Sequence, residues 1–149
     1  MTNGFKVIGI SIRTTNANNQ SLQDLGKLWG QFFAENIIEK IPNKVSSLIF
    51  CIYTDYESDY TGEYTTIIGV PVSTLDEVPS GFIGRTFEAG NFRKFVAKGE
   101  MTSAVAGTWI DIWQRDKELN RKYSYDFEVY GDNSNNGDRS EVEIFVSVK

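Results

Sequence analysis

The sequence predicts an α+β domain in which two similar β-α-β-β units form one twisted antiparallel sheet, with two main helices on one face. Two observations predict this fold. The order strand, helix, strand, strand occurs twice along the chain, and three elements of its first occurrence overlay on the second at nearly the same offset. The length of 149 residues suits a single domain, 1–149.

The first unit is expected at about residues 5–73. Polar and apolar residues alternate in FKVIGISIRTT (5–15), which predicts a strand. A helix is predicted at about 21–39 because apolar residues recur there at spacings of three and four: Leu22, Leu25, Trp29, Phe32, Phe33 and Ile37. Pro42 forbids its continuation. Strands at 47–56 and 63–73, joined by an acidic turn, complete the unit.

The second unit is expected at about residues 82–149, after a linker of turn-forming residues at 74–81. It opens with FIGRTFEAG (82–90) and the short aromatic run NFRKFVAKG (91–99). A helix is predicted at about 101–118, where one stripe holds Met101, Val105, Trp109, Ile112 and Trp113. Strands at 123–132 and 141–149 close the chain.

The overlay of the two units indicates an internal duplication. LGKLWGQF (25–32) overlays VAGTWIDI (105–112), FCIYTD (50–55) overlays FEVYGD (127–132), and IIGVPV (67–72) overlays EIFVSV (143–148). Trp29 thereby falls on Trp109, and Tyr53 falls on Tyr130. Cys51 falls on Glu128, so the duplicated scaffold itself does not require a carboxylate at that position.

Composition excludes several classes of function. A net charge of −5 argues against a nucleic-acid surface, and the densest basic segment, QRDKELNRK (114–122), is interrupted by acids and interpreted as a solvated helix end. The chain has no histidine, which removes Ser-His-Asp and Cys-His catalysis and histidine metal sites. Cys51, the single cysteine, is interpreted as a buried structural thiol. Without an apolar run of about 18 residues, we expect no membrane span and a cytoplasmic location.

The segment YDFEVY (125–130) holds a carboxylate at the centre of an aromatic, strand-like run. Alternation along a strand places Glu128 and Tyr130 on one face together with Asp126, and Phe127 and Val129 on the other. Glu128 is then either an ordinary solvent-facing residue or a carboxylate that faces an aromatic-lined hollow. In the second interpretation it would hold a positively charged group.

Two acidic segments have features of metal sites. Part of the segment 132–143 matches positions of an EF-hand loop, namely Asp132, Ser134, Asn136, Gly137 and Glu143. Its flanks are predicted strands and Asn136-Gly137 favours a hairpin turn, so we interpret it as a hairpin. A second group, interpreted as a structural turn, comprises Asp55, Glu57, Asp59 and Glu63. We therefore expect no metal and no cofactor.

The chain resembles the GyrI-like, AraC-type effector-binding domains, a bacterial family also found fused to multidrug-responsive transcription regulators. The resemblance runs from about residue 5 to 149 and rests on an ordered set of segments: VIGISIRTT, the LW of the first helix, CIYTDYES, GEYTTIIGVPV, FEAGNFRKFVAKG, TWIDIW and DFEVYGD. It implies a duplicated β-α-β-β fold with a ligand cleft between the halves. No helix-turn-helix precedes the first strand, so we expect the binding module alone, without direct DNA contact.

The resemblance also implies a site. In drug-binding members of the family, a glutamate of the penultimate strand, among aromatic rings, pairs with lipophilic cations, and Glu128 is at the matching position. The candidate ligand-binding residues are Glu128, Tyr53, Tyr64, Phe92, Trp109, Tyr130 and Trp113. Trp109 could line the cleft or belong to the core, while Trp29 and Phe33 are assigned to the core.

The leading hypothesis is a stand-alone effector-binding protein, and not an enzyme, that binds lipophilic, cationic small molecules such as drugs or dyes. Cation–π attraction to the rings would add to the charge of Glu128. Two alternatives remain open. One is a hydrolase of electrophilic small molecules, in which Glu128 orients water beside Tyr53 or Trp109. The other is a protein-binding inhibitor of a topoisomerase, which would use exposed acids instead.

Overall fold

The structure is a computed structural model that describes residues 4–17, 20–46, 48–58, 61–99, 101–131 and 141–149. Its helices and strands follow one another as β1 (Phe5–Thr15), α1 (Gln20–Ala34), α2 (Ile37–Lys40), β2 (Ile49–Thr54), β3 (Glu63–Val72), β4 (Ile83–Phe87), β5 (Phe92–Lys98), α3 (Met101–Gln114), α4 (Asp116–Leu119), β6 (Tyr125–Tyr130) and β7 (Glu141–Ser147). The α+β fold predicted from the sequence is confirmed.

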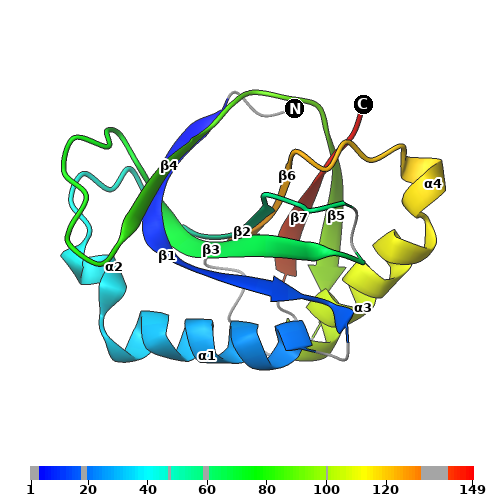
Figure 1. The fold of residues 1–149 in the computed structure, drawn as a ribbon, viewed down its shortest axis with the longest axis horizontal. Coiled ribbons are helices and arrows are strands. Elements are labelled where there is room, and N and C mark those ends of the chain that lie inside the picture. Colours follow the sequence, from blue (N-terminus) through cyan, green and yellow to red (C-terminus); the bar gives the residue numbers. More distant parts are fainter. Residues whose placement is uncertain (1–3, 18–19, 47, 59–60, 100, 132–140) are drawn as a thin grey trace.

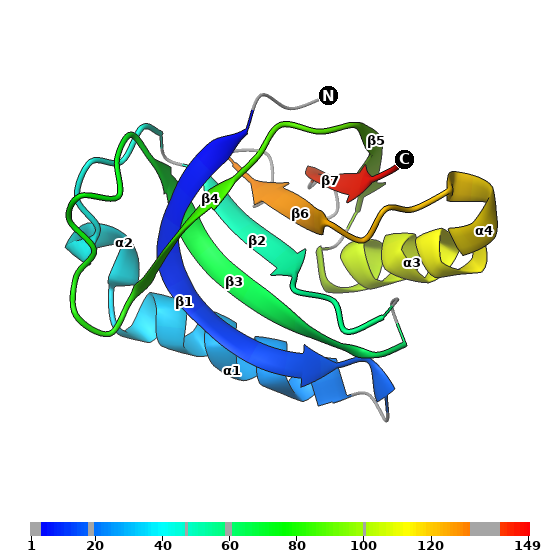
Figure 2. The ribbon, with the colours of Figure 1, turned by 45° about the horizontal axis from the view of Figure 1, so that its top comes forward.

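All seven strands form one antiparallel sheet in the order β4-β1-β3-β2-β6-β7-β5. The sheet is strongly curved, and α1 and α3 lie on the same face of it (Figure 1). The long strand β1 bends across the molecule beside β3 (Figure 2). α1 packs mainly on β1 and β3, whereas α3 packs mainly on β5 and β7, so each helix covers its own half of the sheet.

The duplication appears as a pseudo-twofold arrangement of six strands around the β2-β6 pair. Reading outward from that pair, β3 and β1 in one half correspond to β7 and β5 in the other. Cys51 of β2 is the register partner of Glu128 of β6. Because the sequence overlay equates the same two residues, the pseudo-twofold axis passes between them.

Strand β4 departs from this symmetry. It opens the segment expected to begin the second unit, at about residues 82–149, but it pairs with β1 at the outer edge of the first half. The chain then crosses to the other side of the molecule before β5 begins (Figure 1). β5 therefore takes the place in the second half that β1 takes in the first.

Both predicted helices are shorter than expected. The helix predicted at 21–39 ends at Ala34 and resumes as the single turn α2, because Asn36 adopts a left-handed conformation with φ of 50°. The helix predicted at 101–118 is likewise divided into α3 and α4 at Arg115, whose φ of −102° and ψ of 18° are not helical. Asn is one of the few residues that adopt the left-handed region readily.

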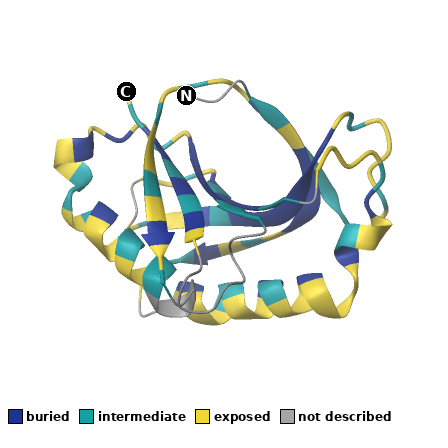
Figure 3. Cartoon of the chain, turned by 180° about the vertical axis from the view of Figure 1, so that it is seen from behind, coloured by how far each residue is buried: buried dark blue, intermediate teal, exposed yellow. Residues whose placement is uncertain are grey.

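Apolar side chains are buried on both faces of the sheet, while the outer surfaces of α1 and α3 are exposed (Figure 3). On the helix face, one cluster lies under α1 and another under α3. The opposite face carries a mainly aromatic cluster that includes Phe50, Phe87, Tyr125 and Phe127. The central strands β2 and β6 thus have a packed aromatic layer behind them and the space between the two helices in front.

Gly9 tests how closely β1 and β3 approach, and Gly26 of α1 serves as the comparison. Gly9 faces Gly69, and a Cβ placed on Gly9 would lie 2.1 Å from the carbonyl oxygen of Ile68. A Cβ on Gly26, in α1, would have no atom within 4 Å. We expect Gly9→Ala to lower the free energy of unfolding by about 1–3 kcal/mol, because the strands must separate. We expect Gly26→Ala to raise it by about 0.5–1 kcal/mol, because alanine favours the helix.

Urea unfolding of both variants measures these changes. A Gly9→Ala variant as stable as the native protein would contradict the close approach of the two strands.

Candidate functional site

Glu128 lies in the middle of β6, on the sheet face that α1 and α3 cover. Its register partners are Cys51 of β2 and Ile144 of β7, so hydrogen-bonded strands flank it on both sides. The residue is only 1% exposed. The interpretation of Glu128 as an ordinary solvent-facing glutamate is therefore wrong.

Three side chains donate hydrogen bonds to the Glu128 carboxylate. The Tyr53 hydroxyl and the Trp109 indole N–H donate to Oε2, at 2.8 and 2.6 Å, and the Tyr130 hydroxyl donates to Oε1, at 2.5 Å. We call these three residues the Glu128 cage. They come from β2, α3 and β6, so the cage joins the two halves of the fold. The Cys51 thiol in turn donates to the Tyr53 hydroxyl oxygen, at 3.5 Å.

Aromatic rings continue from the cage in two directions. The Tyr53 ring meets Trp109 edge-on at 5.4 Å and Tyr64 at 5.8 Å. The Tyr130 ring meets Trp29 edge-on at 5.1 Å, and Trp29 stacks on Phe33 at 5.7 Å. Phe33 is 57% exposed, so its assignment to the core is wrong. A continuous row of rings therefore leads from Glu128 to the surface of α1.

The electrostatics of the cage are unusual because its members are all neutral donors. Burial raises the pKa of Glu128, and the hydrogen bonds from Tyr130, Trp109 and Tyr53 only partly offset that rise. Burial also raises the pKa of Tyr53, Tyr130 and the Cys51 thiol well above their ordinary values. The hydroxyl groups thus keep their protons, and the carboxylate has donors but no cation among the described residues of its cage.

A second buried carboxylate, Asp126, provides the contrast. Strand alternation places it on the same face as Glu128, and it is 0% exposed. Arg121 donates to it at 2.5 Å, the backbone N–H of Ser147 donates at 2.8 Å, and the hydroxyl of Tyr56 donates as well. Asp126 therefore has a fixed counter-ion where Glu128 has none.

Arg121 was missed by sequence reasoning. It belongs to the segment 114–122, which was interpreted as a solvated helix end, yet its side chain is 1% exposed. Besides Asp126 it contacts Asp116, at 3.4 Å, and lies over the Tyr123 ring, at 4.3 Å. The segment looks solvated because charges of both signs alternate in it. The signal of a buried arginine is the nearby Asp126, an acidic residue in a strand rich in aromatic residues.

The structure brings four of the seven candidate residues together: Glu128, Tyr53, Trp109 and Tyr130. Tyr64 forms a second layer behind Tyr53. It is 4% exposed, its hydroxyl donates to Oδ1 of Asn16 at 2.7 Å, and burial raises its pKa to about 12. Trp113 lies one turn beyond Trp109 on α3 and is half-buried, but it is not among the donors to Glu128 that the described residues supply.

Phe92 is not part of the site. It packs against Tyr125 and Phe127, with ring centroids 5.1 and 5.6 Å apart, on the opposite face of the sheet. Alternation along β6 directs Phe127 away from the face of Glu128. β5 belongs to the same sheet as β6 and lies beyond β7, so the Phe92 ring can pack on the same face as Phe127.

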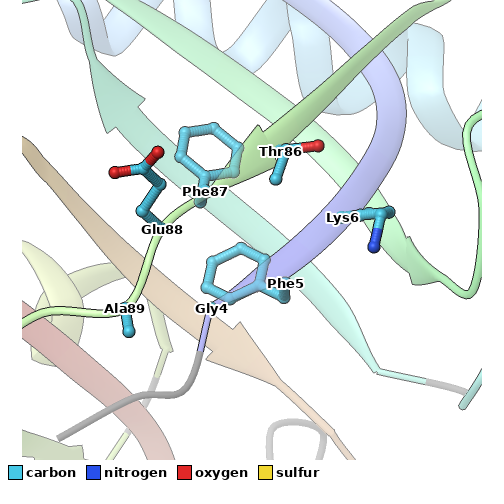
Figure 4. A pocket seen from close by; sticks show the side chains of 7 residues that line it. All are labelled: Gly4, Phe5, Lys6, Thr86, Phe87, Glu88 and Ala89. Carbon is cyan, nitrogen blue, oxygen red and sulfur yellow. The ribbon is translucent and has the colours of Figure 1, made fainter.

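Where the ligand cleft was expected, the cage side chains cover Glu128. Shallow hollows lie elsewhere, one beside β4 at Gly4–Lys6 and Thr86–Ala89 (Figure 4) and one near α2 between Lys40 and Pro79. Within the described part of the chain, no group of three or more His, Cys, Asp or Glu side chains could hold a metal ion. Within that part, too, no helix is long and apolar enough to cross a membrane.

The two acidic segments weighed as metal sites have different outcomes. In the first, residues 132–140, with Asp132, Ser134, Asn136 and Gly137, lie outside the described residues. In the second, Asp55 pairs with Arg85 at 2.7 Å and Glu63 lies 3.6 Å from Arg13. Arginines therefore compensate part of this acidic turn.

Comparison with known proteins gives consistent matches over nearly the whole chain. A family model described as integron-associated effector binding protein matches residues 1–148. YobU of Bacillus subtilis (strain 168), described by name as a candidate transcriptional regulator, is 28% identical over 144 residues, which cover 95% of this chain and 90% of YobU.

Two solved structures have the same fold. An integron cassette protein from the mobile metagenome of Vibrio cholerae is 31% identical, with a TM-score of 0.79, over 99% of this chain and 92% of that one. SAV2435, in a structure bound to tetraphenylphosphonium, is 20% identical, with a TM-score of 0.81, over 99% of this chain and 90% of that one.

The contrast between buried and exposed arginines can be tested by substitution. Arg121→Met would leave the carboxylate of Asp126 buried without its cation, which typically costs about 3–5 kcal/mol of unfolding free energy. Arg115→Met removes the exposed pairs with Asp111 and Glu118 and should cost at most about 1 kcal/mol. Denaturant unfolding compares the two variants, and equal costs would show that Arg121 is not a buried counter-ion.

Glu128 makes stability depend on pH. Its pKa is higher in the folded protein than in the unfolded chain, so its contribution is fully present below the unfolded pKa and is lost as pH rises through the folded pKa. We therefore expect the native protein to lose stability relative to Glu128→Gln as pH rises through this window. Above the folded pKa the difference should be constant.

Urea unfolding at a series of pH values measures this difference. Glu143→Gln, at the surface of β7, is the matched control for the loss of one glutamate carboxyl group. A difference between the native protein and Glu128→Gln that grows in the opposite direction would refute the raised pKa.

Proposed function

This chain belongs to the family of integron-associated effector-binding proteins, and we propose on that basis that it binds lipophilic organic cations with Glu128 as their counter-charge. The family membership confirms the resemblance to effector-binding domains found in the sequence. Family membership identifies the class of function but not the ligand. The chemistry of the Glu128 cage supports the choice of a cation.

One observation carries the proposal: a buried carboxylate whose cage consists entirely of neutral donors. An ionised carboxylate out of water is costly unless a positive charge accompanies it, and hydrogen bonds supply only part of that compensation. At Asp126 the chain itself supplies the cation, Arg121. At Glu128 no such cation lies in the cage. A ligand that places a positive charge against Glu128 would therefore form an ion pair. It would also remove the free-energy cost of a buried ionised carboxylate that has no counter-ion.

The aromatic surroundings determine which cations fit. The rings of Tyr53, Trp109 and Tyr130 adjoin the carboxylate, and each ring face can attract a cation by roughly 0.5–2 kcal/mol. Strongly hydrated cations such as Na⁺ would lose their water shell in this apolar setting. Organic cations with delocalised or shielded charge and apolar substituents lose little hydration, so they fit best.

Access requires the cage to open, because Glu128 is almost fully covered in this conformation. α1 and α3 pack mainly on different halves of the sheet, so either can shift without breaking the packing of the other. Trp109 of α3 covers Oε2, and the row Tyr130–Trp29–Phe33 reaches the surface on α1. We infer that the ligand enters between the helices and replaces the cage contacts with its own.

The two alternative functions have less support. A hydrolase would need a water molecule beside Glu128 and an acid for the leaving group, but the cage donors occupy the carboxylate and Asp126 is paired with Arg121. Inhibition of a topoisomerase would depend on surface acids, and two of those in the acidic turn, Asp55 and Glu63, lie against arginines. The second alternative also leaves the buried Glu128 without a role.

Tetraphenylphosphonium is the first probe, because a structure of this fold, SAV2435, is described as bound to it. Quenching of the three tryptophans reports binding. We expect the native protein to bind this cation and Glu128→Gln to bind it at least about tenfold more weakly, a loss of about 1.4 kcal/mol or more, because the counter-charge is gone. Neutral triphenylphosphine oxide should bind both proteins weakly and equally.

Glu143→Gln is the matched control, since it removes a carboxylate of similar length from the exposed surface. It should bind tetraphenylphosphonium like the native protein. Equal affinity of Glu128→Gln and the native protein, or no binding by either, would overturn the proposal.

A further inference from the structure

The contrast between Asp126 and Glu128 raises the question of what balances Glu128 when no ligand is bound. Resting on the function proposed above, we propose that a proton and a lipophilic cation compete for Glu128, so that binding of one cation releases one proton. The reaction is an exchange. The proton on the carboxyl group passes to solvent or buffer, the cation takes its place as an ion pair, and no covalent bond to the ligand forms.

The geometry of the cage identifies the oxygen that carries the proton. Oε2 accepts two hydrogen bonds, one of them from the Trp109 indole N–H, which is a donor only. Oε1 is contacted by the Tyr130 hydroxyl, at 2.5 Å, and a hydroxyl accepts as readily as it donates. A proton on Oε1 therefore keeps every hydrogen bond of the cage, with only the direction of the Tyr130 bond reversed.

The other titratable groups around Glu128 keep their protons at neutral pH. β2 presents Cys51 and Tyr53, β3 presents Tyr64 behind Tyr53, and β6 presents Tyr130. Burial raises the pKa of each of these groups. The residue that α3 directs to the carboxylate is Trp109, and the register partner on β7 is Ile144; neither titrates.

The charged groups nearby have partners of their own. Asp126, two residues earlier on β6, is held by Arg121. On α1, Asp24 accepts hydrogen bonds from Thr14 at 2.8 Å and Gln20 at 3.1 Å, and these bonds lower its pKa. Of the three carboxyl groups Asp24, Asp126 and Glu128, it is therefore Glu128 whose charge can change when a cation arrives.

Burial gives the exchange its direction. In the closed cage, burial raises the pKa of Glu128 and favours the protonated form. A cation within contact distance favours the ionised form and so lowers the pKa in the bound state. By linkage, the affinity for the cation falls tenfold for each unit that pH drops below the free-state pKa, and it becomes independent of pH above that value.

Calorimetric titration with tetraphenylphosphonium tests this exchange. Titrations in two buffers of different ionisation enthalpy, at steps from about pH 5 to about pH 8, count the protons released per cation bound. Below the free-state pKa of Glu128 we expect release to approach one proton per cation, with the dissociation constant rising about tenfold per pH unit toward acid, and above that pKa we expect release to vanish. Glu143→Gln should release the same number of protons as the native protein.

Carbon-13 NMR of labelled glutamate carboxyl groups gives an independent readout of Glu128 itself. Its signal is identified as the one absent from Glu128→Gln. We expect this carboxyl group to titrate at higher pH in the free protein than in the presence of saturating tetraphenylphosphonium. Far-UV circular dichroism over the same range verifies that the chain stays folded.

The outcomes separate the two proposals. Tetraphenylphosphonium binding with a constant dissociation constant and no proton release would overturn the exchange and leave the proposed function standing. A Glu128 signal that is fully ionised throughout in the free protein would overturn the exchange as well. No binding of tetraphenylphosphonium at any pH would overturn the proposed function itself.

Discussion

Burial of one carboxylate at the centre of the sheet, without a cation from the described residues around it, is the constraint that organises this molecule. Glu128 has hydrogen-bonded strands on both sides, an aromatic layer behind its sheet and helices in front. Hydrogen bonds must therefore replace water around it, and the donors come from both halves of the fold. The same contacts that satisfy the carboxylate also hold α3 against β6 through Trp109.

The duplicated architecture explains why only one half carries the carboxylate. Equivalent positions of β2 and β6 face each other across the pseudo-twofold axis, and these positions hold Cys51 and Glu128. A perfectly symmetric sequence would place two buried carboxylates side by side, and each would make ionisation of the other less favourable. The small Cys51 thiol on one strand leaves space for the carboxylate on the other, and it donates to Tyr53, which in turn donates to that carboxylate. The broken symmetry thus leaves one carboxyl group, that of Glu128, at the pseudo-twofold axis.

Local sequence patterns predicted those parts of the site that depend on one strand or on the repeat. Alternation placed Glu128 and Tyr130 on a common face, and the overlay brought Tyr53 into correspondence with Tyr130. Alternation within one strand does not show whether a residue of another strand lies on the same face of the sheet. Phe92 was therefore assigned to the face of Glu128, although it lies on the opposite face. Arg121 was missed because its burial depends on Asp126, a partner brought close by tertiary packing. The pairing of β4 with β1 likewise arises from a long-range contact that no local pattern records.

Selectivity in such a cage follows from charge more than from shape. The cage rings offer apolar contact to any flat or bulky molecule that the helices admit, and that contact discriminates little between a cation and its neutral analogue. In the proposed function, discrimination arises at Glu128, which attracts a positive charge when ionised and does not when protonated. Because burial sets the balance between these two forms, the depth of Glu128 in the sheet would then determine how strongly charged effectors are distinguished from neutral ones. A carboxylate closer to the surface would be ionised at all times, but water would compete with it for the cation. The deeply buried carboxylate gives a larger difference in affinity between charged and neutral ligands, but it requires a conformational step that opens the cage.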